Sequence, residues 1–164
     1  MIDQLDKQIL EVLASDARAA FKDIADACGV SRAAVHQRVE RMKRDGVIIG
    51  SGFQVNPQSL GYETCTFIGV TLARGSMFDH AVEEISKVPE IVECHFTTGA
   101  YAMMLRLYCR NNYDLKRLLD TINHIDGVSS TETLISLEQS FTRTIPIGLT
   151  EAHEPKRRRT PRND

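Results

Sequence analysis

Residues 24–48, with the sequence IADACGVSRAAVHQRVERMKRDGVI, decide how the first third of this chain folds. Gly29 follows a helical pattern over Phe21–Cys28, at the point where a helix end needs a residue that tolerates a positive φ. Ser31 comes two residues later, and its hydroxyl can accept from the free N–H groups that open another helix. The stretch therefore predicts two helices that are joined by a tight turn.

The helix after the turn has one apolar and one polar face. Val35, Val39 and Met42 recur at spacings of four and three, which places them on one inward stripe. Residues 31–45 hold five basic and two acidic side chains, a local charge of +3. Amides and guanidinium groups can read base edges and cations can hold phosphates, although such a face can also be simply solvated. The polar face carries Arg32, His36, Gln37, Arg41 and Lys43 or Arg44.

The segments on either side complete a DNA-binding pattern. Asp3 can cap a further helix, whose inward stripe includes Ile9. Ala20 stands where a Ser or Thr cap would be expected, and the loss of such a cap costs about 1 kcal/mol. Residues 47–55 form a hairpin pattern with Gly50-Ser51-Gly52 at its tip. Together these features predict a winged helix-turn-helix DNA-binding domain over residues 1–56.

A second domain is expected after a connector at residues 57–61, which Pro57 and Gly61 punctuate. Residues 85–91 align with residues 122–128 as a helix-turn-strand unit that is used twice. A doubled β-α-β unit over residues 62–142 predicts a ferredoxin-like βαββαβ (RAM/ACT-like) domain, so the chain is expected to be α+β. The expected strands are residues 62–72, 91–98, 101–109 and 129–137, and the expected helices are residues 78–88 and 113–125.

The pattern of the strands bears on assembly. Residues 66–70 and 103–107 are apolar at nearly every position. Because the helices cover one face of the sheet, the other face would leave an apolar patch too large for a soluble monomer. We therefore expect a homodimer. Two recognition helices about one helical turn apart would suit double-stranded DNA with a pseudo-palindromic operator.

Composition argues against several other classes of protein. The chain has 164 residues, of which 42% are apolar and 26% charged, as in globular proteins. It has no apolar run that could span a bilayer and no signal-peptide pattern, so we expect a cytoplasmic protein. The four cysteines are scattered in apolar contexts, so no disulfide, metal or cofactor is expected. Residues 151–164 are expected to be a disordered tail, whose basic cluster Lys156–Arg159 either adds phosphate contacts or only solubilises.

Seven motifs in sequence resemble the leucine-responsive/asparagine-activated (Lrp/AsnC, feast/famine) transcriptional regulators over roughly residues 2–140. The motifs are LDKQIL, DAR, IADACGVS, QRVERMKRDGVI, NPQSLGY, FTTGAYAMML and GVSSTETL. The resemblance implies a regulator rather than an enzyme, with dimers that assemble into tetramers or octamers. It also implies that small effectors, usually amino acids, bind between the dimers. By position, it assigns DNA contact to Ser31, Arg32, His36, Gln37, Arg38 and Arg41, and effector contact to Gly99, Tyr101, Ala102, Thr131 and Thr133.

Ala102 departs from the family pattern, which commonly has an acidic residue at this position to partner an ammonium group. Either the effector differs, or another acid such as Glu132 supplies the charge, or the protein has no amino-acid effector. Gly99 can also serve the hairpin alone, and Tyr101 can be a core residue.

Two rival functions stay open at the level of the sequence. The first is an enzyme like the sirohaem decarboxylases, which resemble this family in fold; His95, His124 and Arg106 would then meet tetrapyrrole carboxylates. Against it, a decarboxylase needs no basic recognition helix. The second is a ligand-sensing module whose helix-turn-helix is vestigial.

Overall fold

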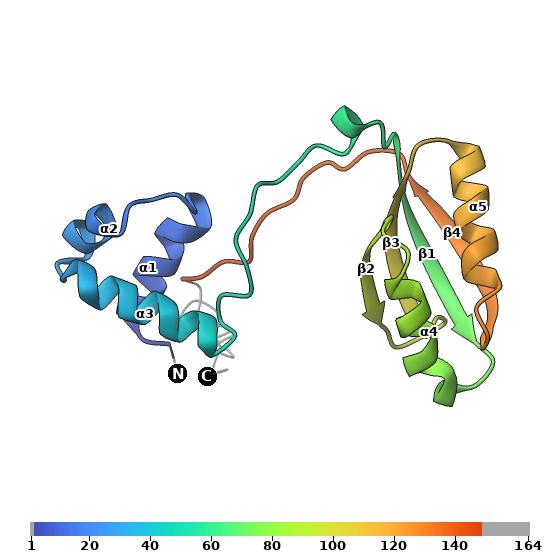
Figure 1. Cartoon of the computed structure of the whole chain (residues 1–164), viewed down its shortest axis with the longest axis horizontal. Helices are drawn as coiled ribbons and strands as arrows, with labels where there is room; N and C mark the ends of the chain where they lie inside the picture. Colours follow the sequence, from blue (N-terminus) through green and yellow to red (C-terminus); the bar gives the residue numbers. More distant parts are fainter. Residues whose placement is uncertain (1, 149–164) are drawn as a thin grey trace, which may run out of the picture. The chain divides into compact units, whose positions relative to one another are not determined.

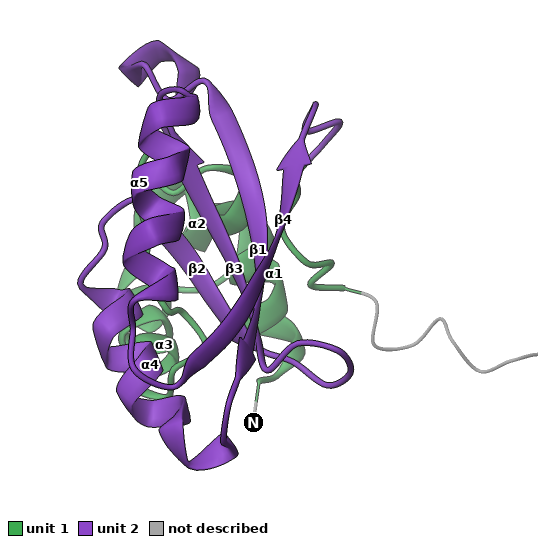
Figure 2. Cartoon of the chain, turned by 90° about the vertical axis from the view of Figure 1, so that its right-hand side faces the viewer, with its two compact units in different colours: residues 1–53, 142–164 green, residues 54–141 purple. Residues whose placement is uncertain are grey.

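The computed structural model describes residues 2–148, and it separates into two compact units (Figure 1). Residues 2–53 and 142–148 belong to unit 1, and residues 54–141 form unit 2 (Figure 2). The chain therefore returns to unit 1 after the last strand, which the sequence patterns did not indicate. The tail expected at residues 151–164 lies outside the described residues.

Unit 1 contains three helices, α1 (Gln4–Ser15), α2 (Phe21–Cys28) and α3 (Arg32–Arg44). Gly29 ends α2 with a φ of 67°, which confirms the predicted turn. The Ser31 hydroxyl oxygen accepts from the Ala34 N–H at 3.1 Å and caps α3. Ala20 gives α2 no side-chain cap, also as predicted. The helices enclose a small apolar core made of Ile9, Ile24, Ala25, Val35, Val39 and Met42.

The wing predicted for unit 1 is absent from the structure. Residues 49–56 contain neither helix nor strand. A two-residue hairpin turn needs a residue with positive φ, and neither Gly50 nor Gly52 is among the glycines that have one. Ile49 and Phe53 are instead 96% and 78% exposed. The hairpin prediction over residues 47–55 was therefore wrong, whereas the helix-turn-helix itself is confirmed.

Unit 2 is the predicted α+β domain with one four-stranded antiparallel sheet. Its strands are β1 (Thr64–Leu72), β2 (Ile91–Phe96), β3 (Met103–Cys109) and β4 (Val128–Ser136), in the order β2-β3-β1-β4. Its helices are α4 (Phe78–Ser86) and α5 (Asn112–Asn123), with short 3-10 turns at Gln58–Leu60 and Gly75–Met77. This chain order and strand order confirm the ferredoxin-like prediction.

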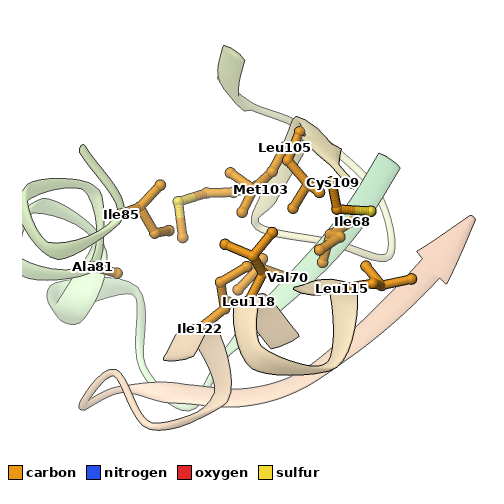
Figure 3. Close-up of a cluster of buried hydrophobic side chains, with 11 residues drawn as sticks. Ile68, Val70, Ala81, Ile85, Met103, Leu105, Cys109, Leu115, Leu118 and Ile122 are labelled. Carbon is orange, nitrogen blue, oxygen red and sulfur yellow. The ribbon is translucent and has the colours of Figure 1, made fainter. Parts of the chain in front are cut away.

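Alternation along the strands separates the two faces of this sheet. Side chains such as Ile68, Leu105 and Leu118 pack between the sheet and the helices (Figure 3). Both helices contribute to this one cluster, so both cover the same face. The opposite face carries Phe67 and Leu134, which pair across β1 and β4 and are 37% and 51% exposed. We call this opposite face the open face of the sheet.

Candidate functional site

The polar face of α3 exposes three of the side chains that the sequence predicted to contact DNA. Arg32, His36 and Gln37 are all exposed. The His36 ring meets the Phe21 ring of α2 edge to face, with 5.9 Å between centroids, which fixes one side of the imidazole. Ser31 lies at the amino end of the helix, where its oxygen is already engaged as the cap. The helix therefore exposes a guanidinium, an imidazole and an amide, which are groups that can recognise base edges.

Arg38 and Arg41 point instead toward α1, where they form ion pairs with two aspartates. Arg38 Nη1 donates to Asp3 Oδ2 at 2.6 Å and to Asp6 Oδ1 at 2.8 Å, and Arg41 Nη2 donates to Asp6 Oδ2 at 2.5 Å. The Asp6 side chain is fully buried, whereas the two arginine side chains are 27% and 39% exposed. A buried carboxylate requires such partners. We call these four residues the aspartate clamp.

The clamp also changes the acid–base properties of its members. Hydrogen bonding from Arg38 lowers the pKa of Asp3 to about 2, and Asp3 in turn raises the pKa of Arg38. Reasoning from the sequence missed Asp6, although a signal was present. Asp6 lies three residues before Ile9 and thus on the inward side of α1, where a carboxylate must find a cation.

The loop between β2 and β3 holds the predicted effector residues Gly99, Tyr101 and Ala102. Gly99 has a φ of 108°, so this turn does require a glycine. The Ala102 N–H donates to the Val70 carbonyl at 2.9 Å, and the Thr97 hydroxyl donates to the Tyr101 carbonyl at 2.9 Å. One backbone hydrogen bond therefore fixes the loop to β1, and the Thr97 side chain braces the loop internally.

The Tyr101 ring packs against Gly69 on the open face of the sheet. A methyl group added at Gly69 would come within 2.6 Å of the Tyr101 ring, so only glycine leaves room for it. The Tyr101 hydroxyl donates to the Glu132 carboxylate, and Glu132 pairs with Gly69 across β1 and β4. This hydrogen bond raises the pKa of Tyr101. Glu132 is thus an acidic group beside the loop, on the strand adjoining β1.

The structure does not place Thr131 and Thr133 beside Tyr101 and its loop. They pair with Val70 and Ile68, which are core residues of the helix-covered face. The Thr131 hydroxyl donates to Asn123 Oδ1 of α5 at 3.1 Å. Both threonines therefore lie on the side of the sheet away from Tyr101. Glu132, between them, is the β4 residue that contacts Tyr101.

The residues that favoured an enzyme do not form one site. His95 and Arg106 both contact Glu93 on the open face. His124 lies at the end of α5, with Nδ1 2.6 Å from the Asp120 carbonyl oxygen. No group of three or more potential metal ligands occurs among residues 2–148. Within the same residues, no helix is long and apolar enough to cross a membrane.

Comparison with known proteins identifies the family. Residues 2–43 match the AsnC-type helix-turn-helix domain, and residues 65–146 match the Lrp/AsnC ligand binding domain. Regulatory protein AsnC of Escherichia coli (strain K12) is 39% identical over 146 residues, which cover 88% of this chain and 96% of that protein. The chain belongs to the Lrp/AsnC family of transcriptional regulators.

Other Lrp/AsnC relatives agree with this assignment. The structure of E. coli AsnC matches with a TM-score of 0.83, covering 88% of this chain and 98% of that one. HTH-type transcriptional regulator FL11 of Pyrococcus furiosus is 33% identical over 148 residues, or 90% of this chain and 97% of that protein. The feast or famine regulatory protein from M. tuberculosis, complexed with L-methionine, matches at 27% identity with a TM-score of 0.82, covering 89% of this chain and 100% of that one.

Membership of the Lrp/AsnC family gives this chain its function. It is a DNA-binding transcriptional regulator with a helix-turn-helix domain and a carboxy-terminal ligand-binding domain. Its relatives are transcriptional regulators, so the decarboxylase alternative is set aside and the chain is not an enzyme.

Proposed function

We propose that this regulator reads a pseudo-palindromic operator through the exposed side chains of α3, with Arg32, His36 and Gln37 at the base edges. The observation that carries the proposal is that these three side chains are exposed on one helix whose apolar stripe is buried in unit 1. Arg32 and Gln37 offer the bidentate donors that suit guanine and adenine. Ser31 places its N–H at the start of α3, where a helix terminus can meet a phosphate. Arg38 and Arg41 act indirectly, by holding α3 on α1.

The proposed operator symmetry needs two copies of the chain. The open face of the sheet exposes Phe67 and Leu134 side by side, which favours burial against a second copy. A homodimer of this kind would carry two helix-turn-helix units, as a two-fold symmetric operator requires. Further association into tetramers or octamers would bring the effector loops of neighbouring dimers together.

The proposed effector is an amino acid or a related small metabolite. The M. tuberculosis relative supports this class of ligand, because its structure is complexed with L-methionine. In the present chain Ala102 brings no carboxylate to the loop, and Glu132 is the acidic group beside it. An ammonium group bound here would therefore compete with the Tyr101 hydroxyl for Glu132. Effector control would then be a population shift between assemblies with different ligand affinities.

DNA reading is tested by fluorescence anisotropy with the DNA upstream of the protein's own gene and with random DNA of the same length. Arg32→Ala and Gln37→Ala should each weaken binding to the cognate DNA more than to random DNA, by about 1–3 kcal/mol if they touch bases. Gln8→Ala, an exposed glutamine of α1, is the matched control and should change neither affinity. Equal losses of affinity for both DNAs would mean that the two residues contact the phosphate backbone of DNA instead. Failure of the wild-type protein to bind either DNA would favour the ligand-sensing module.

Effector binding is tested on the same protein by calorimetric titration with single amino acids and by size-exclusion chromatography with light scattering. An amino acid that binds should shift the distribution of assemblies. Glu132→Gln should weaken its binding because the carboxylate charge is lost. If no amino acid binds to the wild-type protein, the amino-acid part of the proposal is wrong.

A further inference from the structure

The recognition helix has much less free positive charge than its sequence suggests. Of its five cations, Arg38 and Arg41 are in the aspartate clamp, and Lys43 Nζ lies 2.9 Å from Glu40 Oε1. Arg44 Nε lies 4.0 Å from Asp45 Oδ1. Among residues 2–148, Arg32 is therefore the one cation of α3 for which no ion pair is found. The ion pairs of Lys43 and Arg44 are exposed and therefore weak, so a DNA phosphate can readily replace their carboxylates. The clamp is therefore what keeps positive charge of α3 away from phosphates.

The clamp leaves none of its carboxylate oxygens vacant. Asp6 Oδ1 accepts from Arg38, and Asp6 Oδ2 accepts from Arg41 and from the Asp3 N–H at 3.0 Å. Asp3 Oδ1 accepts from the Asp6 N–H at 2.8 Å, and Asp3 Oδ2 accepts from Arg38. Asp3 Oδ2 and both Asp6 oxygens are placed toward the arginines as phosphate oxygens would be.

We propose that Asp3 and Asp6 compete with DNA phosphates for Arg38 and Arg41, and that this competition lowers non-specific DNA affinity and so raises sequence specificity. Phosphate contacts add affinity on every sequence, whereas base contacts add it on one. A phosphate can take either arginine only by leaving the fully buried Asp6 carboxylate with fewer partners, which is unfavourable. Asp3 and Asp6 are thus specificity-determining residues that never touch DNA. This inference rests on the proposed reading of DNA by α3.

A purely structural role for the clamp makes the opposite prediction. If the ion pairs only hold α3 against α1, their removal should lower affinity for every DNA and leave the salt dependence unchanged or weaker. If they withhold two arginines from phosphates, their removal should raise affinity for random DNA and steepen the salt dependence. Each additional phosphate contact changes the slope of log affinity against log salt by about 0.9. The slope therefore separates the two roles.

The test measures affinity for random DNA from about 50 to 200 mM salt, the range over which phosphate contacts change affinity most visibly. Asp6→Asn should steepen the slope by about 0.9 to 1.8, because one or two arginines are released. Asp3→Asn serves as a second variant that is safer for folding, since asparagine caps helices as well as aspartate does; it should steepen the slope by up to about 0.9. Glu11→Gln makes the same charge change at an exposed position of α1 and should leave the slope as in the wild type.

The competition is supported if both clamp variants steepen the slope, gain affinity for random DNA and lose discrimination in favour of the upstream DNA, while Glu11→Gln does none of these. It is overturned if both slopes stay at the wild-type value. It is equally overturned if Arg41→Gln flattens the slope of the otherwise unchanged protein, because Arg41 would then already contact phosphate. If the wild-type protein binds no DNA, the reading of DNA by α3 fails first, and the inference fails with it.

Discussion

The contact between Gly69 and Tyr101 predicts opposite effects of one substitution. Gly69→Ala should destabilise the protein when the Tyr101 ring is present and stabilise it when the ring is removed. Gly69 lies in the middle of β1, and its φ is not in the positive range, so alanine fits its backbone. The obstacle is the Tyr101 ring, of which three carbons would lie 2.6 to 2.8 Å from the new methyl group. The ring must therefore move, and its hydrogen bond to Glu132 moves with it.

The expected size of the effect follows from two opposing contributions. Overpacking of a buried contact costs about 1–3 kcal/mol, and here the ring must shift by roughly 1 Å. Replacing a glycine inside a strand gains about 0.5–1 kcal/mol in conformational entropy. Gly69→Ala should therefore destabilise the wild-type protein by about 1–2 kcal/mol. In a Tyr101→Ala background the same substitution should stabilise by about 0.5–1 kcal/mol. The coupling between the two positions is then about 2 kcal/mol.

The assay is urea unfolding followed by tyrosine fluorescence at one fixed protein concentration, since association shifts apparent stability. All four tyrosines, Tyr62, Tyr101, Tyr108 and Tyr113, lie in unit 2, and the chain has no tryptophan. The signal therefore reports on unit 2 alone, also when Tyr101 is removed. Gly75→Ala is the control, because its new methyl group would meet no atom within 4 Å. The reasoning is refuted if Gly69→Ala costs the same with and without the Tyr101 ring.

Unit 1 offers three further tests. Asp6→Asn should destabilise it by about 1–3 kcal/mol, because the charge-assisted hydrogen bonds from Arg38 and Arg41 are lost or weakened. The exposed Asp26→Asn should change stability by less than about 0.5 kcal/mol. Hydrogen exchange of the α3 amides measures both variants, and wild-type exchange in Asp6→Asn would contradict the role of the clamp. Ala20→Asp should stabilise α2 by about 1 kcal/mol, because residue 20 already has the extended backbone of a cap. Hydrogen exchange measures this effect as well, and an unchanged exchange rate would mean that no cap forms. The pKa of Asp3 is lowered to about 2, so its contribution to stability is complete above the unfolded pKa of about 3.9 and is lost as the pH falls through 2. Asp3→Asn should therefore flatten the dependence of thermal stability on pH in this range, as followed by circular dichroism. Parallel pH curves for the variant and the wild type would refute this prediction.

The sequence by itself determined where the helices and strands lie. Gly29 and Ser31 fixed the turn and the start of α3, and the predicted limits of α2 agree with the structure. The order of strands and helices in unit 2 was equally predictable, with element ends within about two residues, an accuracy that local signals commonly give. Caps, turn glycines and apolar periodicity act over a few neighbouring residues, so they can be read from the chain directly.

Only the tertiary structure decided what several of these residues contact. Arg38 and Arg41 belong to the basic pattern of α3, yet their partners lie 32 to 35 residues earlier, at the N-cap and in the first turn of α1. Glu132 contacts Tyr101, whereas its neighbour Thr131 faces α5, because adjacent residues of a strand point to opposite faces of the sheet. The wing was predicted from Gly50 and Gly52. Glycine also allows other backbone angles, so it does not by itself enforce a hairpin turn. Pairings between distant segments arise from packing, and no local pattern encodes them.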